Sequence, residues 1–257
     1  MGEKTGVSWA HHTFNPWWGC QKVSRGCENC YAETFSVRLE RDLWGPKADR
    51  KIASDTYWKL PLKWARDAAA AGERQRVFCA SMADVFEDRR DLDEPRARLW
   101  ALIEDTPDLD WLLLTKRPEN MNRLAPARWA DRWPSHAWGG ITGENQHQLE
   151  RRWAHLHGVP TLTRFLSIEP MLAPIDIGRA FDRVDDIPEW VIVGGETAPD
   201  ADRIELDVPA AEQLAHDCEM FDLPLFVKQD SGRYPGRQGR LPDWMWARKQ
   251  FPAPLNA

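Results

Sequence analysis

Short apolar segments that each end in polar residues constrain the fold of this chain most strongly. Six such segments follow one another along the sequence, at 77–80, 111–114, 137–142, 164–168, 190–193 and 225–227. Stretches with helical spacing separate them, among them 95–105, 146–157 and 209–221. Strands that alternate with helices predict βα units with parallel strands, and strands that are apolar throughout are typical of burial on both faces. We therefore expect an α/β fold, a partial or complete TIM-like (β/α) barrel.

Polar residues follow each of these segments, and a further strand is expected around 12–15, with a helix at 33–43. In a barrel the carboxyl ends of the strands converge on one face, where active sites are built. The alternative is that these strand ends are polar only because loops are polar. The candidate site residues are Ser81, Asp84, Thr115, Lys116, Thr142, Glu144, Ser167, Glu169, Gly194, Gly195, Glu196 and Lys228.

Three of the five cysteines lie within eleven residues, with the spacing Cys-x6-Cys-x2-Cys. Thiolates of Cys20, Cys27 and Cys30 on a short loop can ligate three corners of one iron–sulfur cubane, whereas a closed zinc site or an ordinary four-iron cluster takes four protein ligands. A [4Fe–4S] cluster held in this way leaves one iron open for S-adenosylmethionine (SAM). The alternatives are a structural zinc with His11 or His12 as fourth ligand, a redox-active Cys27/Cys30 pair, and a three-iron or adventitious cluster.

Composition and charge limit the classes of protein to which this chain can belong. The 257 residues, 42% of them hydrophobic, suffice for one barrel domain, 1–257, with a basic extension at about 230–257. No apolar run approaches the roughly 20 residues that span a bilayer, and the polar residues 1–7 do not resemble a secretory signal. We therefore expect a cytoplasmic protein without disulfides or membrane contact, with Cys79 and Cys218 as buried apolar residues. The net charge of -6 is unlike that of a general nucleic-acid binder.

Seven ordered blocks resemble a family of bacterial and phage proteins named for a three-cysteine motif, which look like radical SAM enzymes distantly similar to spore photoproduct lyase. The resemblance covers nearly the whole chain. After the Gly-Gly-Glu block the family continues with glycine and serine, whereas this chain has Thr197-Ala198-Pro199. The matching blocks are Phe14-Asn15-Pro16 before Gly19-Cys20, Gly26-Cys27-x-Asn29-Cys30-Tyr31-Ala32-Glu33, Val77-Phe78-x-x-Ser81-Met82-x-Asp84, Leu114-Thr115-Lys116-Arg117-Pro118, Phe165-Leu166-Ser167-Ile168-Glu169-Pro170, Trp190-Val191-Ile192-Val193-Gly194-Gly195-Glu196 and Phe226-Val227-Lys228-Gln229.

The resemblance implies a barrel of the radical SAM type, with a [4Fe–4S] cluster and SAM as cofactors and a flavodoxin- or ferredoxin-like electron donor. Some phage members of such a family belong to pathways that decorate thymine in DNA with amino-acid-derived groups. There a radical enzyme is thought to convert an N-linked glycyl group into a C-linked one. The resemblance therefore implies DNA carrying modified thymine as a partner, an isomerase reaction, and, for a phage-encoded chain, the host cytoplasm as location.

Each strand-end residue has an expected role and a simpler alternative. We expect Ser81 and Asp84 to bind the SAM amino group, unless Asp84 only caps a helix. Gly194 and Gly195 permit close approach of the protein backbone to a ligand, and we expect Glu196 to bind ribose or substrate, unless the Gly-Gly-Glu block only forms a turn. The remaining cofactor-binding candidates are Thr115, Thr142, Glu144 and Ser167. The catalytic candidates are Lys116, Glu169 and Lys228, unless a lysine and a glutamate here form a structural ion pair.

A DNA substrate would need an aromatic wall for a flipped base and basic residues for phosphates. Trp17, Trp18 and Trp138 are the candidates for the wall. Competing interpretations are a radical SAM enzyme acting on another nucleic acid or a small molecule, a non-catalytic nucleic-acid-binding module stabilised by zinc or a cluster, and a methyltransferase without radical chemistry. The candidates for the basic rim are Lys22, Arg25, Arg117, Arg233, Arg237 and Arg240.

Overall fold

A computed structural model describes residues 5–181 and 187–253, and so leaves out the first four and the last four residues of the predicted domain and extension. The chain divides into two compact units. The first unit comprises Met1–Val23, Ala32–Gly139 and Val159–Leu162, and the second comprises Ser24–Tyr31, Gly140–Gly158 and Thr163–Ala257. In the part of the chain described, no helix is long and apolar enough to span a bilayer.

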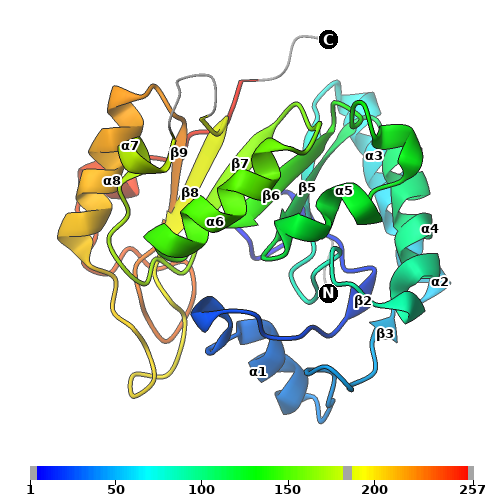
Figure 1. The fold of residues 1–257 in the computed structure, drawn as a ribbon, viewed down its shortest axis with the longest axis horizontal. Helices are drawn as coiled ribbons and strands as arrows, with labels where there is room; N and C mark the ends of the chain where they lie inside the picture. Colours follow the sequence, from blue (N-terminus) through cyan, green and yellow to red (C-terminus); the bar gives the residue numbers. More distant parts are fainter. Residues whose placement is uncertain (1–4, 182–186, 254–257) are drawn as a thin grey trace. The chain divides into compact units, whose positions relative to one another are not determined.

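The first unit is built on parallel strands. Strand β1 (His12–Thr13) pairs with β4 (Gln75–Cys79), and β4 pairs with β5 (Leu109–Thr115), both in parallel. Helix α3 (Leu60–Ala71) contacts β4 and β5. Figure 1 labels α3 and β5. An antiparallel pair, β2 (Trp17–Trp18) and β3 (Lys51–Ile52), lies outside this sheet. The other helices are α1 (Tyr31–Arg38), which begins on the last residue of a second-unit segment, α2 (Asp55–Trp58), α4 (Asp93–Glu104), α5 (Met121–Leu124) and the 3-10 turns η2 (Arg90–Leu92), η3 (Pro118–Asn120) and η4 (Ala127–Trp129).

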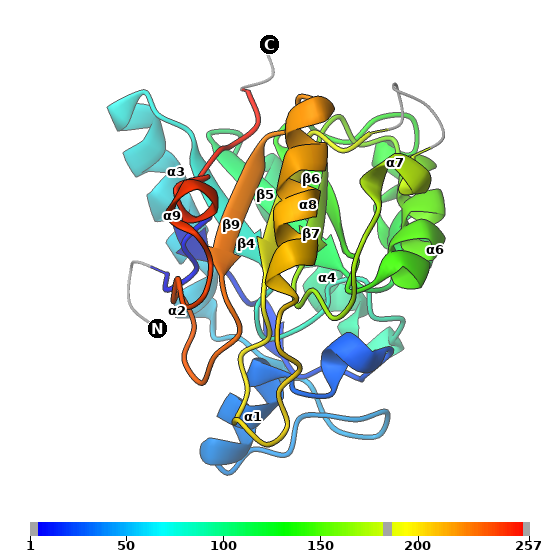
Figure 2. The same cartoon turned by 90° about the vertical axis from the view of Figure 1, so that its left-hand side faces the viewer.

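The second unit repeats this arrangement. Strands β7 (Arg164–Ile168), β8 (Trp190–Gly194) and β9 (Leu225–Gln229) pair in parallel. Helix α8 (Val208–Met220) runs alongside β9 (Figures 1 and 2). Strand β6 (Ala137–Thr142) begins in the first unit and ends in the second, and the hydrogen-bonded order is β1-β4-β5-β6-β7-β8-β9. The remaining helices are η1 (Arg25–Cys27), α6 (Gln146–His157), α7 (Ile177–Ala180) and α9 (Asp243–Trp246).

The predicted α/β class is confirmed. All seven expected strands are present and follow one another in chain order, which a partial (β/α) barrel requires. Helix α6 has the predicted bounds because the Asn145 side chain accepts the Gln148 N–H, which fixes its first turn. Cys79 and Cys218 are both 0% exposed, as expected.

One helix is shorter than predicted. The helix expected at 33–43 ends at Arg38, because Glu40 adopts a left-handed conformation with φ of 56°. The Arg41 N–H then donates to the Ser36 carbonyl oxygen and the Glu40 N–H to that of Val37, which is a Schellman-type helix end. The prediction was wrong here because the apolar spacing continues through Leu39 and Leu43, past the end of the helix.

Candidate functional site

The three clustered cysteines are divided between the two units. Cys20 belongs to the first unit, and Cys27 and Cys30 belong to the segment Ser24–Tyr31 of the second. All five cysteines lie in the described part of the chain, and none forms a disulfide. Within the described residues, no group of three or more histidine, cysteine, aspartate or glutamate side chains is assembled as a metal site. The case for a shared metal therefore rests on the spacing of the cysteines along the chain.

The backbone on both sides of Cys20 is fixed by the first unit. The Gly19 N–H donates to the Met82 carbonyl oxygen at 3.0 Å, and the Cys20 carbonyl oxygen accepts the Gly45 N–H at 2.9 Å. Gly19 has a φ of 111°, and a Cβ there would lie 2.5 Å from the Leu43 carbonyl oxygen. Only glycine fits this position, because both the backbone conformation and the space exclude a side chain.

Arg50 and Glu87, neither of them predicted from the sequence, support the loop that holds Cys20. Their side chains are 0% and 4% exposed and form a two-point ion pair, with Nε to Oε2 at 2.9 Å and Nη2 to Oε1 at 2.7 Å. The same guanidinium donates to the carbonyl oxygens of Leu43, Gly45 and Ala48. A charged side chain that satisfies this many buried acceptors fixes the loop geometry. Hydropathy alone gives no signal for this partnership.

Arg117 reaches the sulfur of the first cysteine. Its Nη1 lies 3.6 Å from Cys20 Sγ and 2.9 Å from Asp84 Oδ2, and its Nη2 donates to the Gln21 carbonyl oxygen at 2.5 Å. Burial raises the pKa of the Cys20 thiol to about 12, and the Arg117 guanidinium opposes this shift. Metal binding at Cys20 would therefore have to displace the proton. Arg117 is 7% exposed, so its predicted place on a DNA-binding rim is wrong.

Asp84 is fully engaged with the protein. Besides Arg117, its carboxylate accepts Thr115 Oγ1 at 2.7 and 2.9 Å, the Lys116 N–H at 3.2 Å and the Phe86 N–H at 3.0 Å. No helix begins at Asp84, so the alternative of a helix cap is wrong; the carboxylate instead joins the ends of β4 and β5. The carboxylate has little remaining capacity to accept from a ligand ammonium.

Ser81 lies beside Asn15 from the segment that follows β1. The Asn15 side-chain amide donates to Ser81 Oγ at 3.1 Å, and its carbonyl oxygen accepts the Met82 N–H at 2.8 Å. Asn15 is 0% exposed, and Ser81 is half-buried. The block Phe14-Asn15-Pro16 therefore fixes the end of β4, next to the residues that hold Cys20.

In the second unit, a buried ion pair holds the residues between Cys20 and Cys27. Glu144, after β6, and Arg152, on α6, form a charge-assisted hydrogen bond, and both side chains are 0% exposed. Arg152 Nη2 donates to Ser24 Oγ at 2.9 Å and Nη1 to the Thr142 carbonyl oxygen at 2.7 Å. A Cβ on Gly26 would lie 3.1 Å from Glu144 Cδ. Glu144 thus packs under this segment.

Arg152 was not among the residues predicted from the sequence, although the sequence carries a signal for its burial. Leu149, Arg152, Trp153 and Leu156 are all buried and lie three, four and seven residues apart on α6. Helical spacing therefore places Arg152 on the apolar face rather than the solvated one. A charge at such a position needs a buried partner, and Glu144 is the acidic residue that follows the preceding strand.

Glu196, after β8, holds the second half of the cysteine segment. Its Oε2 accepts the Asn29 side-chain amide at 3.0 Å and the Ile204 N–H at 2.9 Å. The Asn29 amide also donates to the Asp202 carbonyl oxygen at 2.8 Å. Asn29 separates Cys27 from Cys30 in the sequence, so Glu196 fixes the turn that carries these two thiols.

Glu169 and Lys228 form an ion pair at the ends of β7 and β9, as one of the sequence-based alternatives proposed. Both side chains are partly exposed, at 18% and 15%. They lie beside Gly194, where a Cβ would be 3.5 Å from Glu169 Cγ and from Lys228 Cβ. Gly195 is different, because a Cβ there would lie 2.2 Å from the Ser231 backbone nitrogen. Gly195 is therefore required by the packing of its own chain, with no ligand needed to explain it.

The comparisons with known proteins give a family and no activity. The family model described as "Protein of unknown function (DUF5131)" matches residues 4–243. The chain belongs to the DUF5131 family. No curated protein and no solved structure matches it significantly. For this member of the DUF5131 family, the resemblance to radical SAM enzymes therefore stays a prediction.

The remaining predicted residues of this DUF5131 family member are divided between buried and accessible positions. Ser167 and Thr142 are 1% and 2% exposed, whereas Lys116 is half-buried. Trp17 and Trp138, at 0% and 7% exposure, offer no accessible face, so their predicted place in a base-stacking wall is wrong. Trp17 lies on β2 and Trp138 on β6, and both side chains belong to the buried apolar core.

The predicted basic rim is also smaller than expected. Arg240 donates to both carboxylate oxygens of Asp230, at 2.9 and 2.7 Å, and contacts Glu205 at 3.0 Å. Arg233 and Arg237 are exposed.

Trp18, the third residue of the predicted aromatic wall, is half-buried, and the Arg41 guanidinium lies over its ring at 5.3 Å from the ring centroid.

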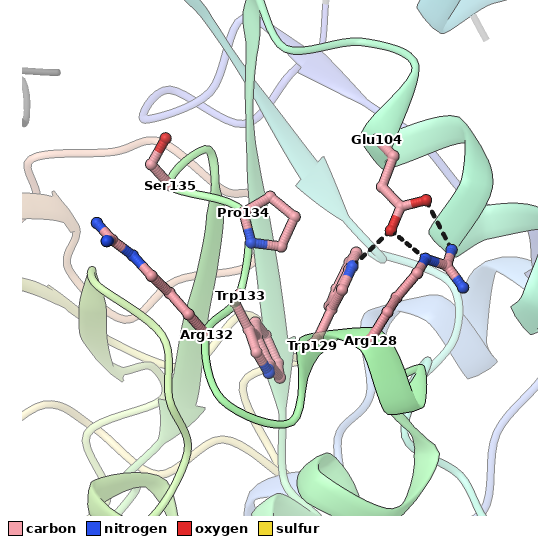
Figure 3. Close-up of a pocket in the computed structure, with 7 residues that line it drawn as sticks. All are labelled: Glu104, Arg128, Trp129, Arg132, Trp133, Pro134 and Ser135. Atoms are coloured by element: carbon pink, nitrogen blue, oxygen red, sulfur yellow. Dashed lines mark hydrogen bonds and ion pairs between the residues drawn. The ribbon is translucent and has the colours of Figure 1, made fainter.

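A pocket of about 440 Å³ lies in the first unit, away from the predicted site residues. Figure 3 shows Glu104, at the end of α4, accepting hydrogen bonds from Arg128 and from the Trp129 indole. Residues 132–135 complete the lining, just before the amino end of β6. The predicted site residues instead follow the carboxyl ends of the strands.

Proposed function

We propose that the chain is a radical SAM enzyme that holds a [4Fe–4S] cluster through Cys20, Cys27 and Cys30. Beside the spacing of these cysteines, one structural observation supports this: acidic residues that follow three strands each anchor a part of the cysteine segment that belongs to their own unit. Asp84 acts through Arg117 on Cys20 and Gln21, Glu144 acts through Arg152 on Ser24, and Glu196 binds Asn29. Active sites of α/β barrels form at the carboxyl ends of their strands.

The donor set suits an iron–sulfur cluster. Three thiols on one short segment supply the soft ligands that such clusters take, and an open iron remains for SAM. The Arg117 N–H directed at Cys20 Sγ matches the hydrogen bonds to ligand sulfurs that tune these clusters. Cys20, Cys27 and Cys30 would hold the cluster, which would supply the electron for reductive cleavage of SAM and so the chemistry of hydrogen abstraction from a substrate.

The residues of the site then divide into two groups. Asp84, Glu144 and Glu196 position the cysteine segment, because their carboxylates are occupied by protein donors. Ser81, Thr142, Ser167 and Gly194 remain the proposed SAM-binding residues, whereas Thr115, whose hydroxyl donates to Asp84 and accepts the Arg117 N–H, belongs to the positioning group. Glu169, Lys228 and Lys116 are proposed to face the substrate. The Glu169–Lys228 pair is suited to this role, because a partly exposed ion pair can exchange one partner for a polar substrate group.

Anaerobic reconstitution tests the proposal. The expected product is a brown, oxygen-sensitive protein with about four irons and as many sulfides per chain, which releases 5′-deoxyadenosine from SAM under strong reductant. Cys20→Ala, Cys27→Ala and Cys30→Ala should each lose iron and colour. Cys218→Ala is the matched control, since this thiol is buried in α8 and should leave iron content unchanged. Stoichiometric zinc without sulfide would favour the structural zinc module instead.

For the substrate, we propose a modified base in DNA, a glycyl-bearing thymine converted from an N-linked to a C-linked form. The family resemblance carries this proposal, and exposed Arg233 and Arg237 supply candidate phosphate contacts. Isomerisation conserves atoms, since the hydrogen removed from the glycyl Cα can be returned after rearrangement. A flavodoxin- or ferredoxin-like donor would supply the electron, in the cytoplasm of the cell that makes the protein.

Digestion of treated DNA tests the substrate. Reduced enzyme and SAM are incubated with glycyl-thymine DNA, and the nucleosides are separated by chromatography with mass detection. The expected product has unchanged mass and altered retention. If 5′-deoxyadenosine formation is indifferent to DNA but is stimulated by a free nucleoside, a peptide or a small metabolite, the DNA proposal is wrong while the radical SAM proposal stands.

A further inference from the structure

Arg117 occupies an unusual place for a residue that follows a barrel strand. Its side chain is buried, and its guanidinium contacts a carboxylate, a backbone carbonyl oxygen and a cysteine sulfur. Its own N–H donates to Thr115 Oγ1 at 2.9 Å. Thr115 Oγ1 in turn donates to the Asp84 carboxylate, which also accepts from the Arg117 guanidinium. Asp84 and Thr115 together therefore fix both the backbone and the side chain of Arg117.

We propose that Arg117 is a positioning residue for the Cys20 sulfur, and that its charge and N–H raise the reduction potential of a cluster bound there. This inference rests on the proposed function. The planar guanidinium donates in fixed directions, so one Nη can hold the Gln21 carbonyl oxygen while the other lies between Asp84 and Cys20. An N–H donated to a ligand sulfur stabilises the more negative, reduced state of an iron–sulfur cluster.

Asp84 is the partner that balances the charge of Arg117. A buried guanidinium is costly unless it is paired, and Asp84 Oδ2 is its partner at 2.9 Å. Both side chains are 9% exposed, so the pair is largely screened from water. Asp84 therefore acts on Cys20 through Arg117 and positions the ligand without touching SAM.

Two measurements on the same variants test this. In the cluster-free protein, amide hydrogen exchange is followed in a peptide covering residues 18–23. Arg117→Met should increase exchange there several-fold, because it removes the bond to the Gln21 carbonyl oxygen. Asp84→Asn should have a smaller effect in the same direction. Arg123→Met is the matched control, because Arg123 is 55% exposed and pairs with Asp88 in the same unit. It should leave this peptide unchanged.

In the reconstituted protein, the midpoint potential of the cluster is measured by a redox titration followed by electron paramagnetic resonance. Arg117→Met should shift the potential to a more negative value, and Arg117→Lys, which keeps the charge, should restore part of the shift. A purely structural role would not move the potential of the fraction that retains its cluster.

The results of these measurements distinguish a failure of the proposed role of Arg117 from a failure of the proposed radical SAM function. Wild-type exchange in Arg117→Met overturns the positioning role, whether or not a cluster is bound. A wild-type potential in that variant overturns the tuning role. If the wild-type protein binds no iron and sulfide, the proposed function and the tuning role both fail, whereas the exchange measurement still decides whether Arg117 positions Cys20.

Discussion

Arg152 and Glu144 form an ion pair in which neither side chain has exposed surface. Breaking such a pair leaves an uncompensated buried charge, which costs about 3–5 kcal/mol. Glu144→Gln keeps the size of the side chain and removes its charge, so it should lower the free energy of unfolding by about that amount. Urea unfolding followed by circular dichroism measures this change.

The control for this prediction is an exposed ion pair. Arg98 and Asp55 are 47% and 84% exposed, and Nη1 lies 2.6 Å from Oδ1. Surface pairs contribute little, so Asp55→Asn should change the free energy of unfolding far less than Glu144→Gln does. Equal effects of the two substitutions would show that the buried Arg152–Glu144 pair contributes no more to the free energy of unfolding than an exposed pair does.

The contact between Asn29 and Glu196 gives a second prediction, on metal loading. Asn29→Asp replaces the amide donor by a second carboxylate next to Glu196 Oε2, so repulsion should release the turn between Cys27 and Cys30. We expect iron content after reconstitution to fall several-fold and trypsin to cleave faster after Arg25. Glu28→Gln, at an exposed neighbouring position, should keep both properties. Unchanged iron in Asn29→Asp would mean that Glu196 does not fix this turn.

The third prediction concerns pH. Burial lowers the pKa of His136 below its usual value of 6.5, although its hydrogen bond to the Ile103 carbonyl oxygen opposes the shift. Below pH 6.5 the unfolded chain therefore binds a proton that the folded His136 does not, and acidification favours unfolding. The free energy of unfolding should fall as the pH is lowered from 6.5, a change that unfolding curves in urea at several pH values can follow.

His136→Gln isolates this contribution. Glutamine can still donate to the Ile103 carbonyl oxygen and does not titrate, so the variant should show a shallower loss of stability on acidification. His11, whose pKa is lowered chiefly by burial, contributes in the same direction and is unchanged in both proteins. His155→Gln, at an exposed position on α6, should keep the wild-type slope. If His136→Gln also keeps that slope, the assignment to His136 is wrong.

The strands could be predicted because their information is local. Residues 109–115 and 190–194 are almost wholly apolar, and burial on both faces of a parallel sheet selects such runs. The end of α1 could not be predicted, because it depends on the left-handed conformation of Glu40, an ordinary residue for a helix.

The sequence predicted several residues of the candidate site, but it did not predict which of them contact one another. The acidic residues after β4, β6 and β8 were identified from their positions, but the sequence suggested ligand contacts for them. Their partners Arg117, Arg152 and Asn29 lie 33, 8 and 167 residues away along the chain. Which polar group satisfies a buried carboxylate depends on tertiary packing, and a protein donor within reach competes with any ligand. The sequence therefore identified these three carboxylates without showing which protein groups they bind.

Gly194 and Gly195 offer a fourth prediction, which separates packing from ligand binding. A Cβ on Gly195 would lie 2.2 Å from the Ser231 backbone nitrogen, so Gly195→Ala must displace the backbone and should lower the free energy of unfolding by about 1–3 kcal/mol. A Cβ on Gly194 would meet its nearest neighbour, Gln229 Cγ, at 3.4 Å, which is an ordinary contact. Gly194→Ala should therefore unfold at the wild-type urea concentration.

Of the two glycines, only Gly194 can be substituted to test where SAM binds. Gly194 lies beside Glu169 and Lys228, at the carboxyl end of β8, where the added methyl group would take space from a bound ligand. Because the protein itself tolerates this methyl group, any loss of SAM affinity in Gly194→Ala reports on the ligand. We expect the dissociation constant for SAM, measured anaerobically on the reconstituted protein, to rise at least tenfold in Gly194→Ala, equivalent to about 1.4 kcal/mol. Wild-type affinity in this variant would place SAM away from the end of β8, and the role of Gly194 would reduce to its turn.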